Sequence, residues 1–245
     1  MKKVRAVLEI KNIEKSYNSF VALKNISLQV NNGELVVLLG PNGAGKSTLF
    51  SIITGLSRAD RGNCFIDGFN IAQDGIEALK RLGVVFQQPT IDLELTVKEN
   101  LFFHSRLHGL ELLKVKKTIE KELSISKLEK KINNKVKTLS GGERRKIELI
   151  RSLLHKPKML LMDEPTVGLD PGSRVDLLKK IIKLKVKGAL SVLWTTHLVD
   201  EAEKADKIII LNKGRIQAIG SKAKILDMAK ENNLEKAFFK LVSKG

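Results

Sequence analysis

The chain has 245 residues, enough to bury a substantial core as one large domain or two closely joined lobes. Hydrophobic residues make up 42% and charged residues 29%, a balance that indicates a globular protein. A single cysteine, Cys64, excludes an internal disulfide, no apolar run approaches the roughly 18 residues of a membrane helix, and no secretory signal follows Met1. We therefore expect a cytoplasmic protein.

The formal net charge is +17, and lysines crowd segments 114–117 and 127–137. Apolar residues stand between these lysines at helical spacing, which predicts helices with basic outer faces. A solvated face explains such charge, and attraction to anionic lipid headgroups is the alternative. Because few aromatic residues accompany the lysines, we do not expect a base-stacking surface for nucleic acid.

The first thirty residues favour three short strands, at 7–10, 21–23 and 26–30. Asn32-Gly33 is typical of a tight hairpin turn, so we expect the third strand to pair with the next one, 35–39. Tyr17, the only tyrosine, lies between the first two strands, where packing in a loop is its simplest role.

A glycine loop separates the apolar run 35–39 from the helix-like segment 49–53. It fits the pattern G-x-x-x-x-G-K-[ST] with Gly40, Pro41, Asn42, Gly43, Ala44, Gly45, Lys46, Ser47 and Thr48. Glycines let successive backbone N–H groups turn inward around a phosphate chain, at a helix N-terminus that favours negative charge. Lys46 is then expected to reach the β- and γ-phosphates and Ser47 to ligate Mg²⁺.

The middle of the chain changes from strands to helices. Segments 62–68 and 82–86 favour strands, and Pro89 disfavours helix before it, so Gln87 is expected in a loop as a turn residue or a ligand-sensing group. From Leu95 to about His155 the pattern is helical, and it begins with a capping box at 96–99.

Two histidines of this helical region, His104 and His108, stand at i, i+4, a spacing that can hold a metal on one helix face. No acidic H-E-x-x-H element accompanies them, so we do not expect a metal there. Further along, Ser140 is a natural N-cap, and Gly141 and Gly142 expose backbone N–H groups at a helix start. By itself this Ser-Gly-Gly element is equally consistent with a capped loop.

Two adjacent carboxylates, Asp163 and Glu164, end the apolar run 159–162. Neighbouring side chains on a strand face opposite ways, so one carboxylate can hold a metal ion while the other polarises a water. His197 ends a later buried strand, 190–196, where ligand groups collect in parallel sheets, although a structural histidine is the simpler interpretation. Two final elements are expected: a hairpin at the sheet edge over 208–220 and helix over 223–242.

These motifs, in this order, resemble the nucleotide-binding subunit of an ATP-binding cassette (ABC) transporter, from Tyr17 to about Gly220. The matching motifs are Walker A at 40–48, the Q-loop at Gln87, the signature at 139–143, Walker B at 160–164, the D-loop at 168–170 and the switch histidine at His197. The resemblance implies an α/β fold: a P-loop NTPase (RecA-like) core with an N-terminal antiparallel β subdomain and an inserted α-helical subdomain.

The resemblance implies one ABC ATPase domain over 1–245. Residues 1–90 and 156–220 would form the nucleotide-binding core lobe, 91–155 the helical signature lobe and 221–245 a C-terminal helical extension. The cofactors would be ATP and Mg²⁺.

The resemblance also implies an ATPase that works as a head-to-tail dimer. Tyr17 would stack on adenine, and the Walker A residues would hold the phosphates. The expected metal ligands are Ser47, Gln87 and Asp163. Glu164 would be the general base, and His197 would hold the γ-phosphate. The residues acting on the partner's nucleotide would be Ser140, Gly141, Gly142, Glu143 and Asp170.

Glu143 departs from the pattern, because the signature usually ends in glutamine. A carboxylate near the triphosphate would weaken binding unless a nearby cation neutralises it or it faces the ribose hydroxyls. Three cations follow it directly: Arg144, Arg145 and Lys146.

Segments 86–101 and 166–170 resemble ATPases of the ABC-2 export group. We therefore expect a second ATPase subunit, a homodimer by preference, and separate transmembrane permease subunits as partners. The protein would lie in the cytoplasm, peripheral on the inner face of the cell membrane. The alternatives are an importer ATPase, or a soluble ABC ATPase acting on ribosomes or nucleic acid, although tandem cassettes and a long coiled-coil insertion are both missing from this sequence.

Overall fold

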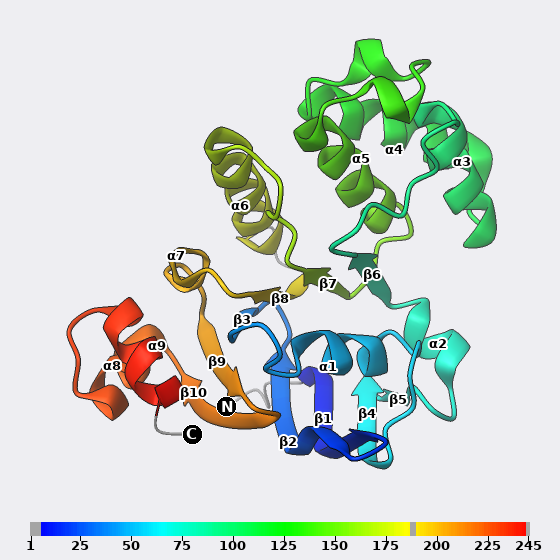
Figure 1. Cartoon of the computed structure of the whole chain (residues 1–245). Helices are drawn as coiled ribbons and strands as arrows, with labels where there is room; N and C mark the ends of the chain where they lie inside the picture. The colour runs from blue at the N-terminus through cyan, green and yellow to red at the C-terminus, as the bar shows by residue number, and fades with distance from the viewer. Residues whose placement is uncertain (1–5, 187–189, 244–245) are drawn as a thin grey trace.

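The computed structural model describes residues 6–186 and 190–243. The strands are β1 (Ala6–Tyr17), β2 (Phe20–Asn31), β3 (Leu35–Leu39), β4 (Arg61–Ile66), β5 (Phe69–Asn70), β6 (Leu82–Val85), β7 (Met159–Asp163), β8 (Ser191–Thr196), β9 (Lys207–Asn212) and β10 (Arg215–Gly220). The helices are α1 (Lys46–Ile53), α2 (Gly75–Leu79), α3 (Val97–Leu107), α4 (Leu112–Ile125), η1 (Glu129–Lys131), η2 (Val136–Thr138), α5 (Gly141–Leu153), α6 (Pro171–Val186), α7 (Val199–Ala202), α8 (Lys222–Ala229) and α9 (Leu234–Ser243). Figure 1 shows their arrangement.

A six-stranded sheet, ordered β10-β9-β3-β8-β7-β6, forms the centre of the core lobe. Its strands run parallel except β10, which forms the expected edge hairpin with β9. Every residue of β3, β7 and β8 is buried, as their nearly continuous apolar sequences predict for a sheet covered on both faces. The register aligns Leu39 with Thr196 and Asp163 with Thr195, so the ends of these strands share one edge.

The second sheet is antiparallel, with the order β2-β1-β4-β5. Its buried face shares one core with α1 and the six-stranded sheet: Leu8 of β1, Leu49 of α1 and Leu161 of β7 all belong to it. Figure 1 shows α1 between the two sheets. The predicted α/β fold with an antiparallel β subdomain is therefore confirmed.

The expected hairpin at Asn32-Gly33 is wrong. A turn does form there, with the Glu34 N–H donating to the Asn31 carbonyl at 3.1 Å, but β2 pairs with β1 and β3 joins the other sheet. The cause is tertiary: β3 is apolar at every position and is buried between β8 and β9, whereas the alternating β2 suits a sheet with one exposed face. Segments 21–23 and 26–30 are parts of this single strand β2.

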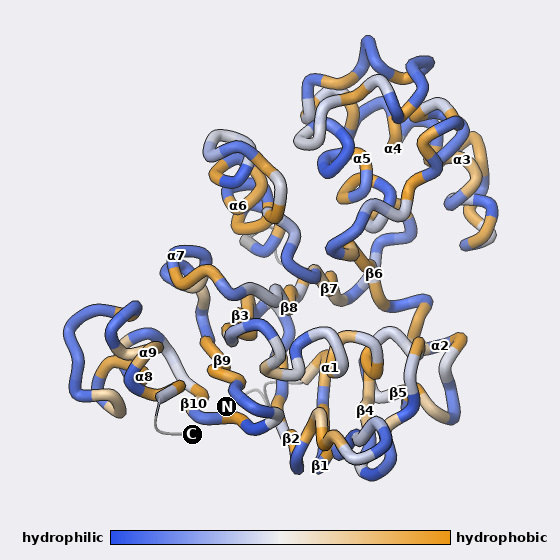
Figure 2. Tube along the Cα trace, viewed as in Figure 1, coloured by the Kyte–Doolittle hydropathy of each residue, from blue (hydrophilic) through white to orange (hydrophobic). Residues whose placement is uncertain are grey.

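Between β6 and β7 the chain leaves the core lobe and forms a helical lobe around a separate hydrophobic core. The core is lined by α3, α4 and α5, and Figure 2 shows orange stretches within these otherwise blue helices. The predicted capping box of α3 is present, since Thr96 Oγ1 accepts from the Glu99 N–H and Glu99 Oε2 accepts from the Thr96 N–H.

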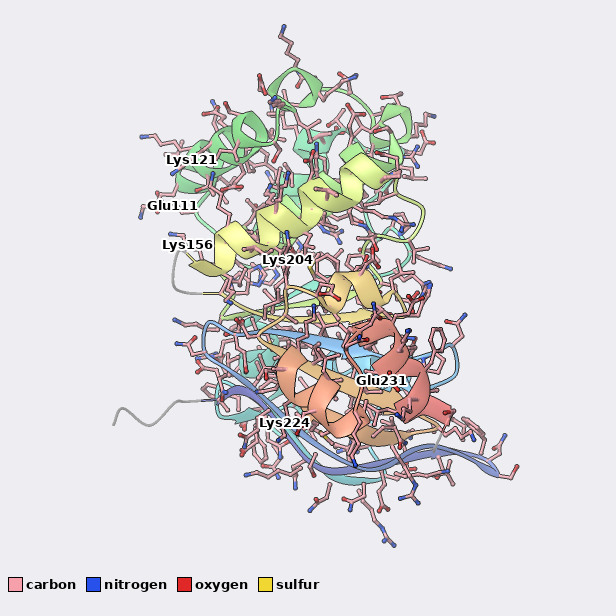
Figure 3. All side chains as sticks on the ribbon, turned by 90° about the vertical axis from the view of Figure 1, so that its left-hand side faces the viewer. Glu111, Lys121, Lys156, Lys204, Lys224 and Glu231 are labelled. Carbon is pink, nitrogen blue, oxygen red and sulfur yellow. The ribbon has the colours of Figure 1, made fainter. Side chains whose placement is uncertain are left out.

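The C-terminal segment expected as one helical region forms two helices, α8 and α9, because Lys230 adopts a left-handed conformation with φ 53° and ends α8. Both pack against the β9–β10 edge of the sheet. Figure 3 shows the labelled lysines on the outer surface, and Lys121, Lys156, Lys204 and Lys224 are all exposed. Among the residues described, no helix combines the length and apolar character needed to span a membrane.

Candidate active site

The glycine loop follows β3 and leads directly into α1. Gly45, at its end, has φ 107°, and a Cβ there would lie 2.8 Å from the Ala22 carbonyl oxygen, so only glycine fits. No side chain caps the α1 N-terminus and no acidic residue lies in its first turn. The free N–H groups and the helix dipole therefore remain available to an anionic ligand.

Lys46 brings a buried positive charge to this loop, since its side chain is 5% exposed. Its Nζ donates to the carbonyl oxygens of Gly40 at 2.8 Å and Pro41 at 3.1 Å. The same Nζ lies 3.3 Å from Glu164 Oε1, which joins the phosphate loop to the end of β7. A buried ammonium among acceptors is suited to phosphate oxygens, as the motif predicts.

The two carboxylates meet at the same sheet edge through one threonine. Thr195 Oγ1 donates to Asp163 Oδ1 and accepts from the Glu164 N–H at 3.2 Å. Glu164 has φ 41°, an uncommon backbone conformation that turns its side chain back towards the site. Thr195 was not predicted as a site residue. A hydroxyl residue near the end of an otherwise apolar buried strand could have indicated it, because a buried hydroxyl needs a hydrogen-bond partner.

Three polar side chains converge on Glu164. Its Oε2 lies 3.1 Å from His197 Nδ1 and 3.4 Å from Gln87 Nε2, and its Oε1 faces Lys46. The structure thus brings the predicted Gln87, Glu164 and His197 together, with His197 38% exposed. A carboxylate oriented by a histidine beside a lysine can accept a proton from a water in this site.

Burial raises the pKa of the Asp163 carboxyl, and the neighbouring Glu164 charge raises it further, while Thr195 and Lys46 act in the opposite direction. A divalent cation would offset this repulsion between two carboxylates. Ser47 lies exposed in the first turn of α1. With Gln87 and Asp163, it makes hydroxyl, amide and carboxylate oxygens available as metal ligands. This donor set fits Mg²⁺, which prefers hard oxygen ligands.

The loop of Gln87 is attached to α5 by a buried ion pair. Arg145 donates to the carbonyl oxygens of Phe86 at 2.6 Å and Gln87 at 2.9 Å, and it pairs with Glu148 at 2.8 Å. Glu148 also accepts from the Thr90 N–H at 2.8 Å. This link was not predictable from local sequence patterns, because it joins residues nearly sixty positions apart.

The start of α5 holds the predicted Ser140, Gly141 and Gly142. Ser140 is an exposed N-cap, and Glu143 completes a capping box, with Glu143 Oε2 accepting from the Ser140 N–H at 2.8 Å. Lys131 lies 4.0 Å from Glu143. The Glu143 carboxylate thus satisfies the N-terminus of its own helix.

The two arginines that follow Glu143 in sequence have other partners. Arg144 donates to the carbonyl oxygens of Lys137 and Leu139, and Arg145 is engaged with the Gln87 loop. Adjacent helix positions face different directions, which explains why neither arginine contacts Glu143.

Besides the residues at the start of α5, two further predicted site residues lie outside the cluster around Glu164. Tyr17 ends β1 and is 47% exposed, with Lys15 Nζ 5.3 Å from its ring centre. Asp170 caps α6, accepting from the N–H and the hydroxyl of Ser173. Figure 1 shows α5 in the helical lobe, apart from α1. One chain therefore does not bring Ser140 to its own phosphate loop.

Residues 23–167 match the protein family described as ABC transporter. The linearmycin resistance ATP-binding protein LnrL of Bacillus subtilis is 39% identical over 217 residues, which cover 88% of this chain and 70% of that protein. The Nod factor export ATP-binding protein I of Rhizobium etli is 37% identical over 221 residues, with coverage of 90% and 70%. The probable sulfate/thiosulfate import ATP-binding protein CysA of Chlorella vulgaris is 37% identical over 219 residues, with coverage of 89% and 92%.

Solved structures agree with this family. A structure described as the ATP binding subunit of an ABC transporter superposes with a TM-score of 0.88 at 29% identity, covering 96% of this chain and 99% of that one. A nucleotide-free ATP-binding cassette from an ABC transporter superposes with a TM-score of 0.80 at 29% identity, with the same coverage.

Proposed function

This chain belongs to the ABC transporter family as an ATP-hydrolysing, ATP-binding subunit, and we propose that it works as a head-to-tail dimer that drives substrate export through separate membrane subunits. The observation that carries the proposal is the division of one chain into an open phosphate loop and a separate Ser-Gly-Gly helix start.

The exposure of the signature residues supports the dimer. Ser140 and Gly141 are exposed in the helical lobe, while Lys46 and Glu164 are buried at the core edge. A second copy, rotated by half a turn, would place its Ser140, Gly141 and Gly142 over the first copy's phosphate loop, with Glu143 and Asp170 nearby. An isologous pair of this kind closes after two subunits.

Within each site, Glu164 would act as general base, because its carboxylate is oriented by His197 and Gln87 and lies at the carboxyl edge of the sheet. His197 would also contact the γ-phosphate. Ser47, Gln87 and Asp163 would hold Mg²⁺, which supplies charge neutralisation during phosphoryl transfer. Tyr17, exposed at the end of β1, would stack on adenine.

The dimer is tested with Glu164→Gln protein, which we expect to bind ATP and Mg²⁺ and to elute as a dimer in size-exclusion chromatography with light scattering. The matched control adds Gly141→Asp, which places a carboxylate at the exposed start of α5 and should return the protein to monomers. If ATP-bound Glu164→Gln protein stays monomeric at high concentration, the head-to-tail dimer is wrong.

An exposed apolar surface of the helical lobe supports contact with a permease. Phe103, Leu107 and Leu113 are 60%, 70% and 76% exposed. They lie on α3 and α4, beside a groove of about 670 Å³ that Phe102, Phe103 and Leu112 help to line. Exposed apolar clusters of this kind mark protein contacts, so we place the permease here.

Export is the proposed direction because Phe86 to Leu101 resembles the ABC-2 export ATPases and because two relatives carry resistance and export in their names. An importer is the second candidate, since the CysA relative is named for import and matches at similar identity. A soluble role on ribosomes or nucleic acid remains the alternative outside transport, with the +17 charge as its motivation.

We would purify the tagged protein from gently solubilised membranes of its own cell and identify its companions by mass spectrometry. A stoichiometric polytopic membrane protein is expected, and its family distinguishes export from import. The Phe103→Ser/Leu113→Ser variant should lose this companion, whereas Ile76→Ser, which changes a 75% exposed residue of α2, should keep it. Recovery with ribosomes or nucleic acid alone would overturn the transporter proposal.

A further inference from the structure

A third histidine joins the pair on α3. His155 follows α5, and its ring stacks on His108 with centroids 4.0 Å apart, while His104 and His108 are 4.5 Å apart. One ligand nitrogen from each of the three rings lies within 4.8 Å of the other two. The cluster is half-buried and lies between the end of α3 and the start of the connection to β7.

Two buried ring nitrogens of this cluster have no hydrogen-bond partner among the described residues. His155 Nε2 lies 3.1 Å from the Leu82 carbonyl oxygen. Since a carbonyl only accepts, Nε2 carries the proton and Nδ1 presents a lone pair. His155 Nδ1 and His104 Nε2 are both buried without a hydrogen-bond partner. Buried polar atoms are seldom left unpaired, and a bound metal ion would satisfy these two.

The protonation state of the cluster suits a metal. Burial lowers the pKa of His104 to about 3, with His108, Arg151 and His155 contributing in that order, and burial lowers the pKa of His155 to about 4. Burial also lowers the pKa of His108. Imidazole ligates metals in its neutral form, which burial of the three rings favours.

Arg151 is a cation whose charge acts on His104 and opposes a bound metal ion. It donates to the Thr90 carbonyl oxygen at 2.8 Å, and the charge of Glu148 acts on it favourably. Its charge is thus partly balanced within α5. Binding by the three histidines must still overcome the remaining repulsion between Arg151 and the metal ion. This repulsion weakens the site without removing it.

We propose that His104, His108 and His155 bind a single transition-metal ion of the Zn²⁺ class. Tetrahedral Zn–N bonds of about 2.1 Å bring ligand nitrogens to about 3.4 Å from one another. The three nitrogens lie within 4.8 Å of one another, so small rotations of the rings must shorten these distances by up to about 1.4 Å. Half-buried rings at the end of a helix can make this adjustment, and the fourth position remains open to water. The Leu82 carbonyl orients His155 as outer-shell acceptors do in metal sites.

Such an ion would tie α3 to the connection between α5 and β7, and through Leu82 to β6 of the core lobe. It would stand apart from the proposed Mg²⁺ ligands on α1 and β7, and its imidazole donors would select against Mg²⁺, which prefers oxygen ligands. The inference is independent of the transport direction and of the permease.

The test is isothermal titration calorimetry of the full chain with Zn²⁺, after treatment with EDTA and in excess Mg²⁺. We expect one equivalent to bind and the apparent Tm to rise. Co²⁺ in place of Zn²⁺ should give the visible absorption of a tetrahedral nitrogen site. Variants His104→Gln and His108→Gln should each weaken Zn²⁺ binding at least tenfold, a scale that even outer-shell changes reach.

The chain offers a matched control, because it contains four histidines and the fourth, His197, lies at the other site. His197→Gln should bind one equivalent as the unaltered chain does. Circular dichroism shows whether each variant is folded, and His108, at the end of α3, is the safer of the two substitutions. Absence of stoichiometric Zn²⁺ binding, or equal binding by His108→Gln, would overturn the proposal.

Discussion

Two helices of this protein, α1 and α5, have glycines at their N-termini, where an anion such as phosphate can bind. The two helices differ in whether a side chain caps that N-terminus. At α1, Gly45 offers no capping side chain, and the first turn has no acid. At α5, Ser140 and Glu143 close a capping box. An uncapped N-terminus can hold an anion by itself, whereas a capped one is already satisfied and can only add contacts to an anion held elsewhere.

The two helices also differ in how they reach the edge of the six-stranded sheet where Glu164 lies. The α1 helix continues directly from the loop that holds Lys46, so its position follows from chain connectivity. The α5 helix reaches the same edge through Arg145 and Glu148, which hold the backbone of the Gln87 loop. A change at the signature helix can therefore reach Gln87 through a buried ion pair.

Among the changes considered, breaking the Arg145–Glu148 ion pair should have the largest effect, and that effect is on stability. Arg145→Met leaves Glu148 buried without its cation, and we expect the free energy of unfolding to fall by about 3–5 kcal/mol, measured by urea denaturation. Arg144→Met, one position away and partly exposed, should cost far less. The double variant Arg145→Met/Glu148→Leu should recover most of the loss, and equal costs for the two single arginine variants would contradict the role of the pair.

The next largest effect concerns turnover at the open site. Glu164→Gln should lower the ATPase rate by about a hundredfold or more, the scale of a positioned base, while ATP binding remains. Glu143→Gln makes the same chemical change at the start of α5 and should alter the rate only a few-fold. A near-normal rate in Glu164→Gln would assign the base to another residue.

Removing the cap of α5 or of α3 should distinguish an effect on stability from an effect on dimerisation. Ser140→Ala and Thr96→Ala remove the same hydroxyl cap from α5 and α3, so each should cost about 1 kcal/mol of unfolding free energy. Only Ser140→Ala should also weaken ATP-driven dimerisation of the Glu164→Gln protein, measured by analytical ultracentrifugation. Equal dimerisation by the two variants would remove Ser140 from the nucleotide interface.

The smallest effect is expected for the charge at Glu143. Glu143→Gln keeps the box, since glutamine also serves at this position, but removes a carboxylate from the side expected to face the triphosphate. We expect ATP-driven dimerisation of the Glu164→Gln protein to tighten by about twofold to fivefold, or about 0.4–1 kcal/mol for a screened charge. The effect should shrink at high salt, and tightening that does not depend on salt would exclude this electrostatic cause.

Elements encoded over short stretches were predictable. The phosphate loop lies in nine consecutive residues, and the capping box at Thr96 and the N-cap Ser140 are set by spacings of three. Strands β3 and β7 were also predicted, because β3 is apolar throughout and β7 is apolar up to Asp163, although the pairing expected for β3 was wrong. In each case the physical cause is local: backbone conformation, helix-end hydrogen bonding or continuous burial.

Contacts between distant segments were decided by tertiary structure alone. The register of β7 and β8 places Thr195 between Asp163 and Glu164, and packing of α3 against α5 brings His155 to His108. The choice of β1 over β3 as partner of β2 also depended on burial in two different sheets. The sequence by itself therefore determined the phosphate loop and the helix starts, whose chemistry acts over a few residues. Only the folded chain determined the hydroxyl, ion-pair and histidine clusters, because register and packing bring their members together.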